Sequence, residues 1–399
     1  MLAFLAIGLL TLRPRPELAP LSAATPVWCV VCGAHGVVDV VLNVLLFIPL
    51  GLGLGMAGIR PRAAILIAAL TTLTVELLQL GVVAGRDASL SDLVTNTLGG
   101  AIGIVLARRW REVLLPTPGT ATALTAVWAA LVLAVTAGTG LAVAPSMPDP
   151  PYWGQWTPEL GGLLQHEGRV ESAQVEDIAT PGRRVPASAA LADSLADGEI
   201  GALVTAVLAG PPLRTAPIFR MVDGFGRQAL LIAQDGRDLI VETGTRSERL
   251  RLRGITVRLE DAMPAGERVR IAVRSDPREY AVSVHLMRGP ARELSVSRSV
   301  AWGWALLLPF LNRIDGRHIL IDAAWLAALM LPLGWWTESL RSRLSGLAIG
   351  VAVLVAALGG GSTLFGLAAP AWTAWAGGTG GLVAGWTGAA LARRRIADR

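Results

Sequence analysis

Lysine is absent from this chain of 399 residues, and charge of either sign is scarce. There are 35 arginines and 30 acidic residues, so that 16% of the chain is charged, whereas a soluble domain carries about 25%. Hydrophobic residues make up 53% of the chain, and the mean hydropathy is +0.54. This composition excludes an ordinary soluble globular protein and predicts an integral membrane protein embedded in a lipid bilayer.

Familiar catalytic and binding motifs are missing too. The G-x-S-x-G, H-E-x-x-H and P-loop patterns do not occur, and neither do the cysteine and histidine spacings of zinc sites. The net charge of +5 does not indicate nucleic acid, because the arginines flank apolar stretches instead of forming a basic stripe with aromatic residues. We therefore expect no cofactor, no metal and no nucleic-acid partner.

Cysteine is limited to Cys29 and Cys32, which are separated by two valines. The pair is a candidate disulfide or a pair of inert thiols, and two other interpretations stay open. A metal site would need two more ligands, of which His35 supplies one. A redox site would need a thioredoxin-like βαβ context, which the surrounding sequence lacks.

Apolar stretches predict about eight transmembrane helices. The stretches 1–12 and 91–107 are short for a span, which needs about 20 residues. The first lacks a basic n-region and a small-residue cleavage site, so we do not expect a cleaved signal peptide. The stretches are 1–12, 37–58, 62–84, 91–107, 120–143, 319–336, 344–367 and 371–391.

Between residues 144 and 298 the charge rises and continuous apolar runs vanish. Short alternating segments rich in Val, Ile and Leu replace them, separated by turn signals such as Asp223-Gly224 and Asp235-Gly236. This pattern predicts an all-β sandwich inserted between two membrane bundles. The predicted strands are 216–222, 228–234, 238–242, 249–253, 256–259, 268–273 and 280–286.

The arginine positions predict how the chain crosses the membrane. Arginine-containing loops at 59–62, 108–111 and 337–343, together with the C-terminus, would face the cytoplasm. Both termini would then be inside and the β domain outside. The apolar piece 299–311 would be an interfacial segment rather than a ninth span, because it is short and carries Trp302 and Trp304.

Six polar residues, here called the polar cluster, interrupt three of the apolar stretches. They are Asp39 and Asn43, Glu76 and Gln79, and Asp92 and Asn96. Each pair has helical spacing, so that its side chains share one helix face. Carboxylates at bilayer depth are costly and mark a functional site by default. Arg86, in the loop between the second and third stretch, would stabilise their ionised forms.

Three interpretations of the polar cluster stay open. It is a site for a polar headgroup, a sugar-phosphate lipid or a cation, or it is hydrogen-bonding glue worth about 0.6 kcal/mol per contact, or it conducts protons or ions. Glue can use amides and hydroxyls without desolvating a charge, so three carboxylates beside one arginine favour the ligand site. Gly51-x3-Gly55 and Gly99-x3-Gly103 are small-residue packing signatures on the first and third of these helices.

The order and spacing of these residues resemble the VanZ-like family. The chain contains the family's D-x3-N-x3-F-x-P-x-G helix from Asp39 to Gly51 and its E-x-x-Q pair from Glu76. Its G-R-x-x-S-x-x-D-x3-N-T-x-G segment runs from Gly85 to Gly99. The resemblance covers about residues 1–115 and implies a bacterial cell-envelope protein of the inner (cytoplasmic) membrane. The family takes its name from a glycopeptide-resistance accessory protein, and the resemblance implies no particular reaction.

The β region resembles the concanavalin A-like sandwiches of the LamG type, which are jelly rolls, through stretches 217–223, 228–234, 238–242 and 268–273. Such folds often bind glycans, although fold does not imply function. Candidate residues for stacking on a sugar are Tyr152, Trp153, Trp156 and Tyr280, which can equally be interface anchors or core residues. Glycan binding and a spacer or partner-docking role both stay open.

We therefore predict a VanZ-like transmembrane domain (1–115), a transmembrane helix with a linker (116–145), the β sandwich (146–298), and an interfacial segment with further transmembrane helices (299–399). The leading hypothesis is that the polar cluster binds an envelope lipid or glycan precursor at the outer leaflet, with the sandwich assisting recognition. The alternatives are a membrane enzyme acting on such a lipid and a non-catalytic scaffold that docks glycans or partners. The missing hydrolase motifs favour a role other than catalysis.

Overall fold

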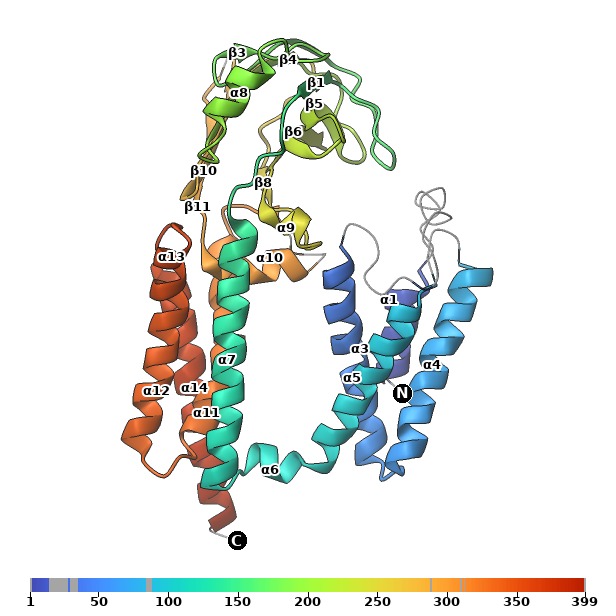
Figure 1. Cartoon of the computed structure of the whole chain (residues 1–399), viewed down its shortest axis with the longest axis vertical. Helices are drawn as coiled ribbons and strands as arrows, with labels where there is room; N and C mark the ends of the chain where they lie inside the picture. The colour runs from blue at the N-terminus through green and yellow to red at the C-terminus, as the bar shows by residue number, and fades with distance from the viewer. Residues whose placement is uncertain are drawn as a thin grey trace. The chain divides into compact units, whose positions relative to one another are not determined.

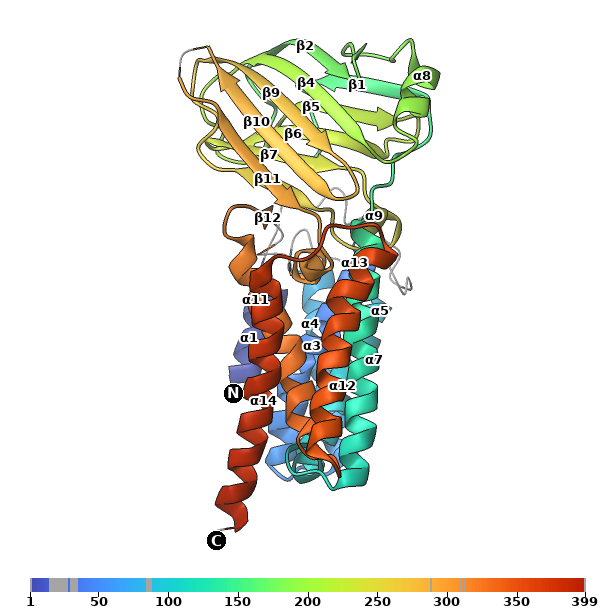
Figure 2. The ribbon, with the colours of Figure 1, turned by 90° about the vertical axis from the view of Figure 1, so that its left-hand side faces the viewer.

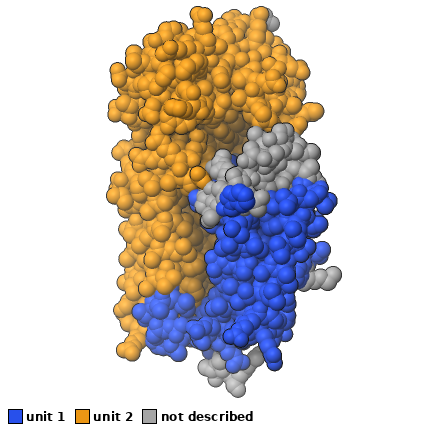
Figure 3. All heavy atoms as spheres, turned by 45° about the vertical axis from the view of Figure 1, so that its right-hand side comes forward, with its two compact units in different colours: residues 1–124, 393–399 blue, residues 125–392 orange. Residues whose placement is uncertain are grey.

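The computed structural model describes residues 2–13, 28, 35–83, 88–287, 289–308, 311 and 313–397. The chain divides into two compact units, which Figure 3 shows in different colours. The first contains residues 1–124 and 393–399, and the second contains residues 125–392. The described part of the first unit is helical, whereas the second holds both β-sheets and further helices.

The first unit is a group of helices drawn in blue and cyan in Figure 1. They are α1 (Leu2–Thr11), α3 (Gly36–Met56), α4 (Pro61–Gly81), α5 (Leu90–Arg108) and α6 (Trp110–Leu114). α4 begins with a proline, whose fixed φ suits the first turn and whose missing N–H would have no helical partner there. α5 begins after Ser89, whose hydroxyl accepts a hydrogen bond from the backbone N–H of Asp92 at 3.1 Å.

Glycines let α3 and α5 approach until their backbones touch. A Cβ atom added to Gly51 would lie 2.0 Å from the carbonyl oxygen of Gly100. One added to Gly103 would lie 2.2 Å from the carbonyl oxygen of Ile48. The predicted small-residue signatures therefore pack these two helices against each other, as such spacings do in membranes.

The second unit combines most of α7 with further helices and two sheets, and Figure 2 shows the sheets at one end of these helices. The helices are α7 (Pro118–Val143), α11 (His318–Thr337), α12 (Arg343–Val355), α13 (Gly361–Leu364) and α14 (Trp372–Ala397). A π-helical turn, η3 (Ala356–Gly360), connects α12 with α13. The indole of Trp128 on α7 donates to the carbonyl of Leu329 on α11 at 2.7 Å, which joins these helices.

Six helices in the described part of the chain are long and apolar enough to cross a membrane. They are α3, α4, α5, α7, α11 and the helix Arg343–Leu364. Six of the eight predicted stretches are thereby confirmed as membrane-competent, which supports a multi-pass membrane protein. The remaining two stretches are helical: α1 has 10 residues, about 15 Å, and the glycine-rich α14 falls outside the six. A total of eight spans stays a prediction.

Two sheets face each other across one hydrophobic core of the second unit. The first has the order β1 (Tyr152–Trp156), β5 (Ala216–Asp223), β6 (Gln228–Asp235), β7 (Asp238–Thr243), β8 (Thr256–Leu259) and β12 (Arg313–Ile314). The second has the order β11 (Arg292–Ser297), β10 (Glu279–Leu286), β9 (Arg268–Ser275), β4 (Ile200–Val207), β2 (Arg169–Val175) and β3 (Ile178–Ala179). Neighbouring strands are antiparallel except β8 and β12, which are parallel.

Alternation of apolar and polar residues explains the packing of the sheets. In β9, Val269, Ile271 and Val273 are buried in the shared core, while the arginines between and beside them are exposed. From the first sheet, Phe219 and Ile232 enter the same core. Six of the seven predicted strands are confirmed, whereas the jelly-roll topology stays a prediction.

The predicted strand at 249–253 is wrong. These residues follow the short helix α9 (Arg246–Arg249), and Arg251 has a φ of 54°. This left-handed conformation does not occur inside an extended strand. The alternation of arginine and leucine at this position belongs to a turn and not to a paired strand.

The prediction that Trp302 and Trp304 anchor an interfacial segment is also wrong. Both are 0% exposed, in the turn η2 (Val300–Trp302) and the helix α10 (Gly303–Leu307). The indole of Trp304 donates to the carboxylate of Asp322 on α11 at 2.7 Å. The two rings fill the core that the sheets share with the helices, so they are not available to lipid. Tyr152 and Tyr280, at 1% and 0% exposure, are core residues as well.

One arginine, Arg298, is completely buried where the second sheet meets the end of α7. Its guanidinium donates to the carbonyl of Val143 at 2.8 Å and to the hydroxyl of Ser275 at 2.6 Å. Its Nε donates to the carbonyl of Asp276 at 3.2 Å, and its guanidinium carbon lies 5.3 Å from the ring centre of Tyr280. Burial lowers the pKa of Arg298, whereas the neighbouring Tyr280 and Asp276 act in the opposite direction.

We expect Gly51→Ala to destabilise the helix packing of the first unit by about 1–3 kcal/mol, the range for overpacking. Its methyl group would have to displace the backbone of Gly100. Gly53→Ala is the matched control on α3, since nothing lies within 4 Å of a Cβ added there. The measurement is the thermal unfolding midpoint of the purified full chain in mild detergent. Equal midpoints for the two variants would contradict the backbone contact.

Arg298→Met should destabilise the second unit by about 1–3 kcal/mol or more, because it leaves buried acceptors of the guanidinium, such as the Val143 carbonyl, unsatisfied. Arg169→Met is the control, since its ion pair with Glu171 involves an arginine that is 77% exposed, and such a change alters stability by about 0.5 kcal/mol at most. Denaturant unfolding followed by tryptophan fluorescence measures both. A midpoint for the Arg298 variant that matches the control would show that the buried arginine does not hold this junction.

Candidate functional site

The polar cluster lies at one end of the helices α3, α4 and α5. α3 and α5 begin at this end, and α4 ends there. Asp39 and Asn43 lie near the start of α3, Glu76 and Gln79 near the end of α4, and Asp92 and Asn96 near the start of α5. The helical spacing seen in the sequence therefore brings side chains from three helices to one level of the first unit.

A hydrogen bond between side chains connects α3 with α5. The amide Nδ2 of Asn43 donates to Oδ1 of Asp92 at 2.8 Å. Both residues are half-buried. A hydrogen bond to an ionised carboxylate is stronger than one between neutral groups, so this pair fixes the position of the Asp92 carboxylate.

Glu76, near the end of α4, contacts the start of α5. Its Oε2 accepts a hydrogen bond from the backbone N–H of Ser89, the N-cap residue, at 2.7 Å. A helix N-terminus stabilises negative charge through its unpaired N–H groups and its dipole. The Glu76 side chain is 7% exposed, and among the described residues no ion pair involves it. The helix end is therefore the group that the structure offers to compensate this buried carboxylate.

Two amide side chains connect the remaining helices. Asn96 donates from Nδ2 to the hydroxyl of Thr72 at 2.9 Å, and Gln79 donates from Nε2 to the carbonyl of Thr11 at 2.9 Å. The oxygens Oδ1 of Asn96 and Oε1 of Gln79 are buried and have no hydrogen-bond partner in the part of the chain that the structure describes. Within the described residues, two acceptors of the polar cluster thus stay unsatisfied.

Of the other predicted site residues, Asp39 alone lies within the described part of the chain. The Asp39 side chain is exposed, unlike the other five members of the polar cluster. Arg86, Cys29 and Cys32 lie outside the described residues, so the predicted arginine partner and the candidate disulfide stay predictions. Conversely, sequence reasoning missed Thr11 and Thr72 as partners, because no spacing pattern marks a threonine that contacts a neighbouring helix.

The chemistry of the site follows from its donors and acceptors. Three carboxylates, together with two amide oxygens that have no partner among the described residues, make it rich in hydrogen-bond acceptors, which suit a ligand with hydroxyl, amine or amide N–H groups. Among the described residues, no group of three His, Cys, Asp or Glu side chains is arranged to hold a metal ion. The arrangement favours recognition of a polar donor-rich group.

Comparison with known proteins gives one match. Residues 8–112 match the model of the VanZ/LLP1 family, a range that contains the whole polar cluster and the helices α3, α4 and α5. No curated protein and no solved structure matches the chain. The predicted VanZ-like resemblance is confirmed for this N-terminal region. The resemblance of the β region to concanavalin A-like sandwiches stays a prediction.

A double-mutant cycle with Asn43→Ala and Asp92→Ala should show a coupling energy of about 0.6 kcal/mol, the average for polar contacts between membrane helices. The measured quantity is the free energy of unfolding of the purified chain in detergent. Asn43→Ala combined with Thr97→Ala is the control, because Thr97 bonds back to Leu93 in its own helix. Coupling as small as in the control would contradict the bond between α3 and α5.

Proposed function

We propose that this chain, whose residues 8–112 are VanZ-like, binds the polar headgroup of an envelope lipid or glycan precursor through the polar cluster. The observation that carries the proposal is that the polar cluster contains the buried Glu76 carboxylate and two buried oxygens, of Gln79 and Asn96, that have no partner among the described residues. A ligand that donates hydrogen bonds would satisfy these acceptors. The candidate ligand-binding residues remain Asp39, Asn43, Glu76, Gln79, Arg86, Asp92 and Asn96.

Hydrogen bonding between the helices explains part of the polar cluster but not all of it. Three contacts do join helices: Asn43 to Asp92, Asn96 to Thr72, and Gln79 to Thr11. Each buried acceptor left unpaired costs about 1–3 kcal/mol, more than the 0.6 kcal/mol or so that a typical glue contact contributes. If the polar cluster only joined the helices, an uncharged polar residue at position 76 would be sufficient. The excess of acceptors therefore favours a ligand over glue.

The acceptor-rich chemistry narrows the ligand class. Sugar hydroxyls and amino or amide N–H groups donate hydrogen bonds that carboxylates accept at close range. A glycolipid or lipid-linked sugar presents such groups at the surface of a bilayer. The proposed ligand is therefore a lipid with a hydroxyl-rich or amine-bearing headgroup.

The sandwich is proposed to lie on the same side of the membrane as the polar cluster. The cluster is at the start of α5, and the chain then passes through α5 and α7, both long and apolar enough to span, before it enters the sheets. Two crossings return the chain to its starting side. The arginines of 108–111, between the two helices, mark the cytoplasmic side under the positive-inside rule. The proposal thus has both parts on the outer side of the cytoplasmic membrane.

The test is lipid co-purification. Wild-type chain and the variants Glu76→Gln and Asn96→Ala are purified from bacterial membranes in mild detergent, and bound lipids are identified by mass spectrometry. Thr74→Val is the control on α4, because Thr74 is exposed and bonds back to Leu70. We expect Glu76→Gln to lower retention of the specific lipid about tenfold or more, since a hydrogen bond to a charged group contributes about 1.5–3 kcal/mol.

Stability is measured on the same samples, since a misfolded variant would also lose lipid. A headgroup-bearing lipid lost from both cluster variants, with unfolding midpoints near that of Thr74→Val, supports binding. Lipid retention identical in all four proteins would remove the binding proposal and leave interhelical packing as the role of the polar cluster.

A further inference from the structure

Five exposed arginines lie at the end of the first unit where α3 ends and α4 begins, opposite the polar cluster. Two of them flank the proline that starts α4, and a third is the last residue of α5. The short helix α6 follows, and Figure 1 shows it lying crosswise to α5 at this end. These residues are called the arginine patch and are Arg60, Arg62, Arg108, Arg109 and Arg111.

Two segments that are far apart in the sequence form the arginine patch together. A guanidinium N–H of Arg108 donates to the carbonyl of Ile59 at 3.3 Å. A Cβ atom added to Gly55, near the end of α3, would lie 2.5 Å from the Cβ of Ala107 on α5. The loop before α4 is therefore packed against the end of α5, so that Arg60 and Arg108 belong to one surface.

The arginine patch carries positive charge that the protein does not neutralise. Within residues 59–62 and 108–112, Glu112 is the only acidic residue, and it pairs with Arg109 at 3.7 Å. The other four arginines of the patch form no ion pair in the part of the chain that the structure describes. Like charges that share a surface repel one another, so an anion from outside the chain would stabilise the patch.

Exposed apolar side chains place α6 at the surface of the bilayer. Trp110 is 49% exposed and Leu114 is 47% exposed, and their spacing of four residues puts them on one side of the helix. α6 follows the candidate span Leu90–Arg108, so it lies at the depth of the lipid headgroups. Tryptophan is enriched at this depth, and a helix with an apolar side and a basic side lies in the plane of the interface. The anions within reach of the arginine patch are therefore lipid phosphates.

We infer that the arginine patch binds the phosphate groups of anionic phospholipids, with α6 lying in the membrane surface. A guanidinium donates two parallel hydrogen bonds to one phosphate. The guanidinium carbon of Arg111 lies 5.4 Å from the centre of the Trp110 ring, so the cation and the aromatic ring are presented at one place. A zwitterionic lipid brings its own cation, which the patch repels, so it fits less well. The inference does not rest on the function proposed for the polar cluster, which lies at the other end of these helices.

The probe is a phosphatidylglycerol titrated into the delipidated full chain in mild detergent, with a phosphatidylcholine of the same acyl chains as the comparison. Native mass spectrometry measures the apparent affinity for each lipid. The patch variant combines Arg60→Gln with Arg111→Gln, one change in each segment, and leaves the hydrogen bond of Arg108 intact. Its control combines Arg270→Gln with Arg274→Gln, two exposed arginines of β9, and removes the same charge from the second unit.

We expect the wild type to bind the glycerol lipid at least about fivefold more tightly than the choline lipid, the ratio that one arginine near an anionic lipid surface contributes. The patch variant should weaken glycerol-lipid binding about fivefold or more and change choline-lipid binding less. Glu112→Gln should tighten glycerol-lipid binding, because it removes the acidic side chain beside the patch. The control variant should match the wild type.

Equal affinity of the wild type for the two lipids would overturn the inference. So would a patch variant that matches the Arg270 and Arg274 control, or a Glu112→Gln variant that binds the glycerol lipid more weakly than the wild type. Unfolding midpoints equal to wild type confirm that the variants are folded, and their exposed positions make this the expected result. The co-purification test with Glu76→Gln measures the polar cluster, so either proposal can fail alone.

Discussion

The bilayer supplies no hydrogen-bond partners, and this constraint governs both units of the protein. Every polar group placed among the membrane helices must be satisfied by the protein itself or by a bound ligand. In the first unit, α3 and α5 touch through glycines, so that the polar side chains at their starts come within hydrogen-bonding distance. The few acceptors without a partner among the described residues of this unit are therefore informative, because hydrocarbon cannot satisfy them.

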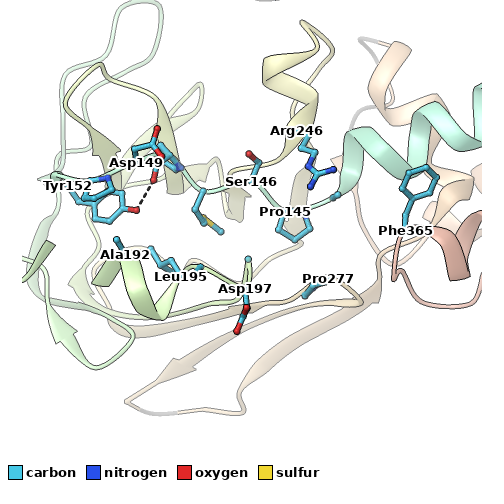
Figure 4. Close-up of a pocket in the computed structure, with 16 residues that line it drawn as sticks. Pro145, Ser146, Asp149, Tyr152, Ala192, Leu195, Asp197, Arg246, Pro277 and Phe365 are labelled. Carbon is cyan, nitrogen blue, oxygen red and sulfur yellow. Dashed lines mark hydrogen bonds between the residues drawn. The ribbon is translucent and has the colours of Figure 1, made fainter. Parts of the chain in front are cut away.

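The second unit meets the same constraint at the place where a membrane helix becomes part of a soluble domain. The last carbonyls of α7 have no partner within the helix, and the buried guanidinium of Arg298 donates to the carbonyl of Val143. The same guanidinium contacts Ser275 and Asp276 at the end of β9. One side chain thus couples a helix end to a sheet, and the linker that leaves this junction forms one wall of a cavity of about 410 Å³ (Figure 4).

Local patterns predicted the elements that depend on local chemistry. The apolar stretches became helices, and short segments rich in Val, Ile and Leu between turn signals located six strands within a residue or two. Burial of one face imposes a period of two on β9 and β10, whereas β5 and β6 are buried on both faces. The strand predicted at 249–253 failed because alternation does not reveal the positive φ of Arg251. Trp302 and Trp304 were assigned to lipid because a tryptophan's sequence neighbours do not show which distant surface covers its ring. β1 and β2 lacked a clear apolar signal and take their place from their partners.

By itself, the sequence determined that the protein is membrane-embedded, that a β region is inserted between helices, and that a VanZ-like set of polar residues occupies three helices. These properties follow from composition, periodicity and spacing, which act over a few turns of chain. Only the tertiary structure decided which polar groups meet. Asn43 reaches Asp92 across 49 residues of chain and Gln79 reaches Thr11 across 68, and no local pattern encodes such contacts. The oxygens that have no partner among the described residues likewise reflect how distant segments pack.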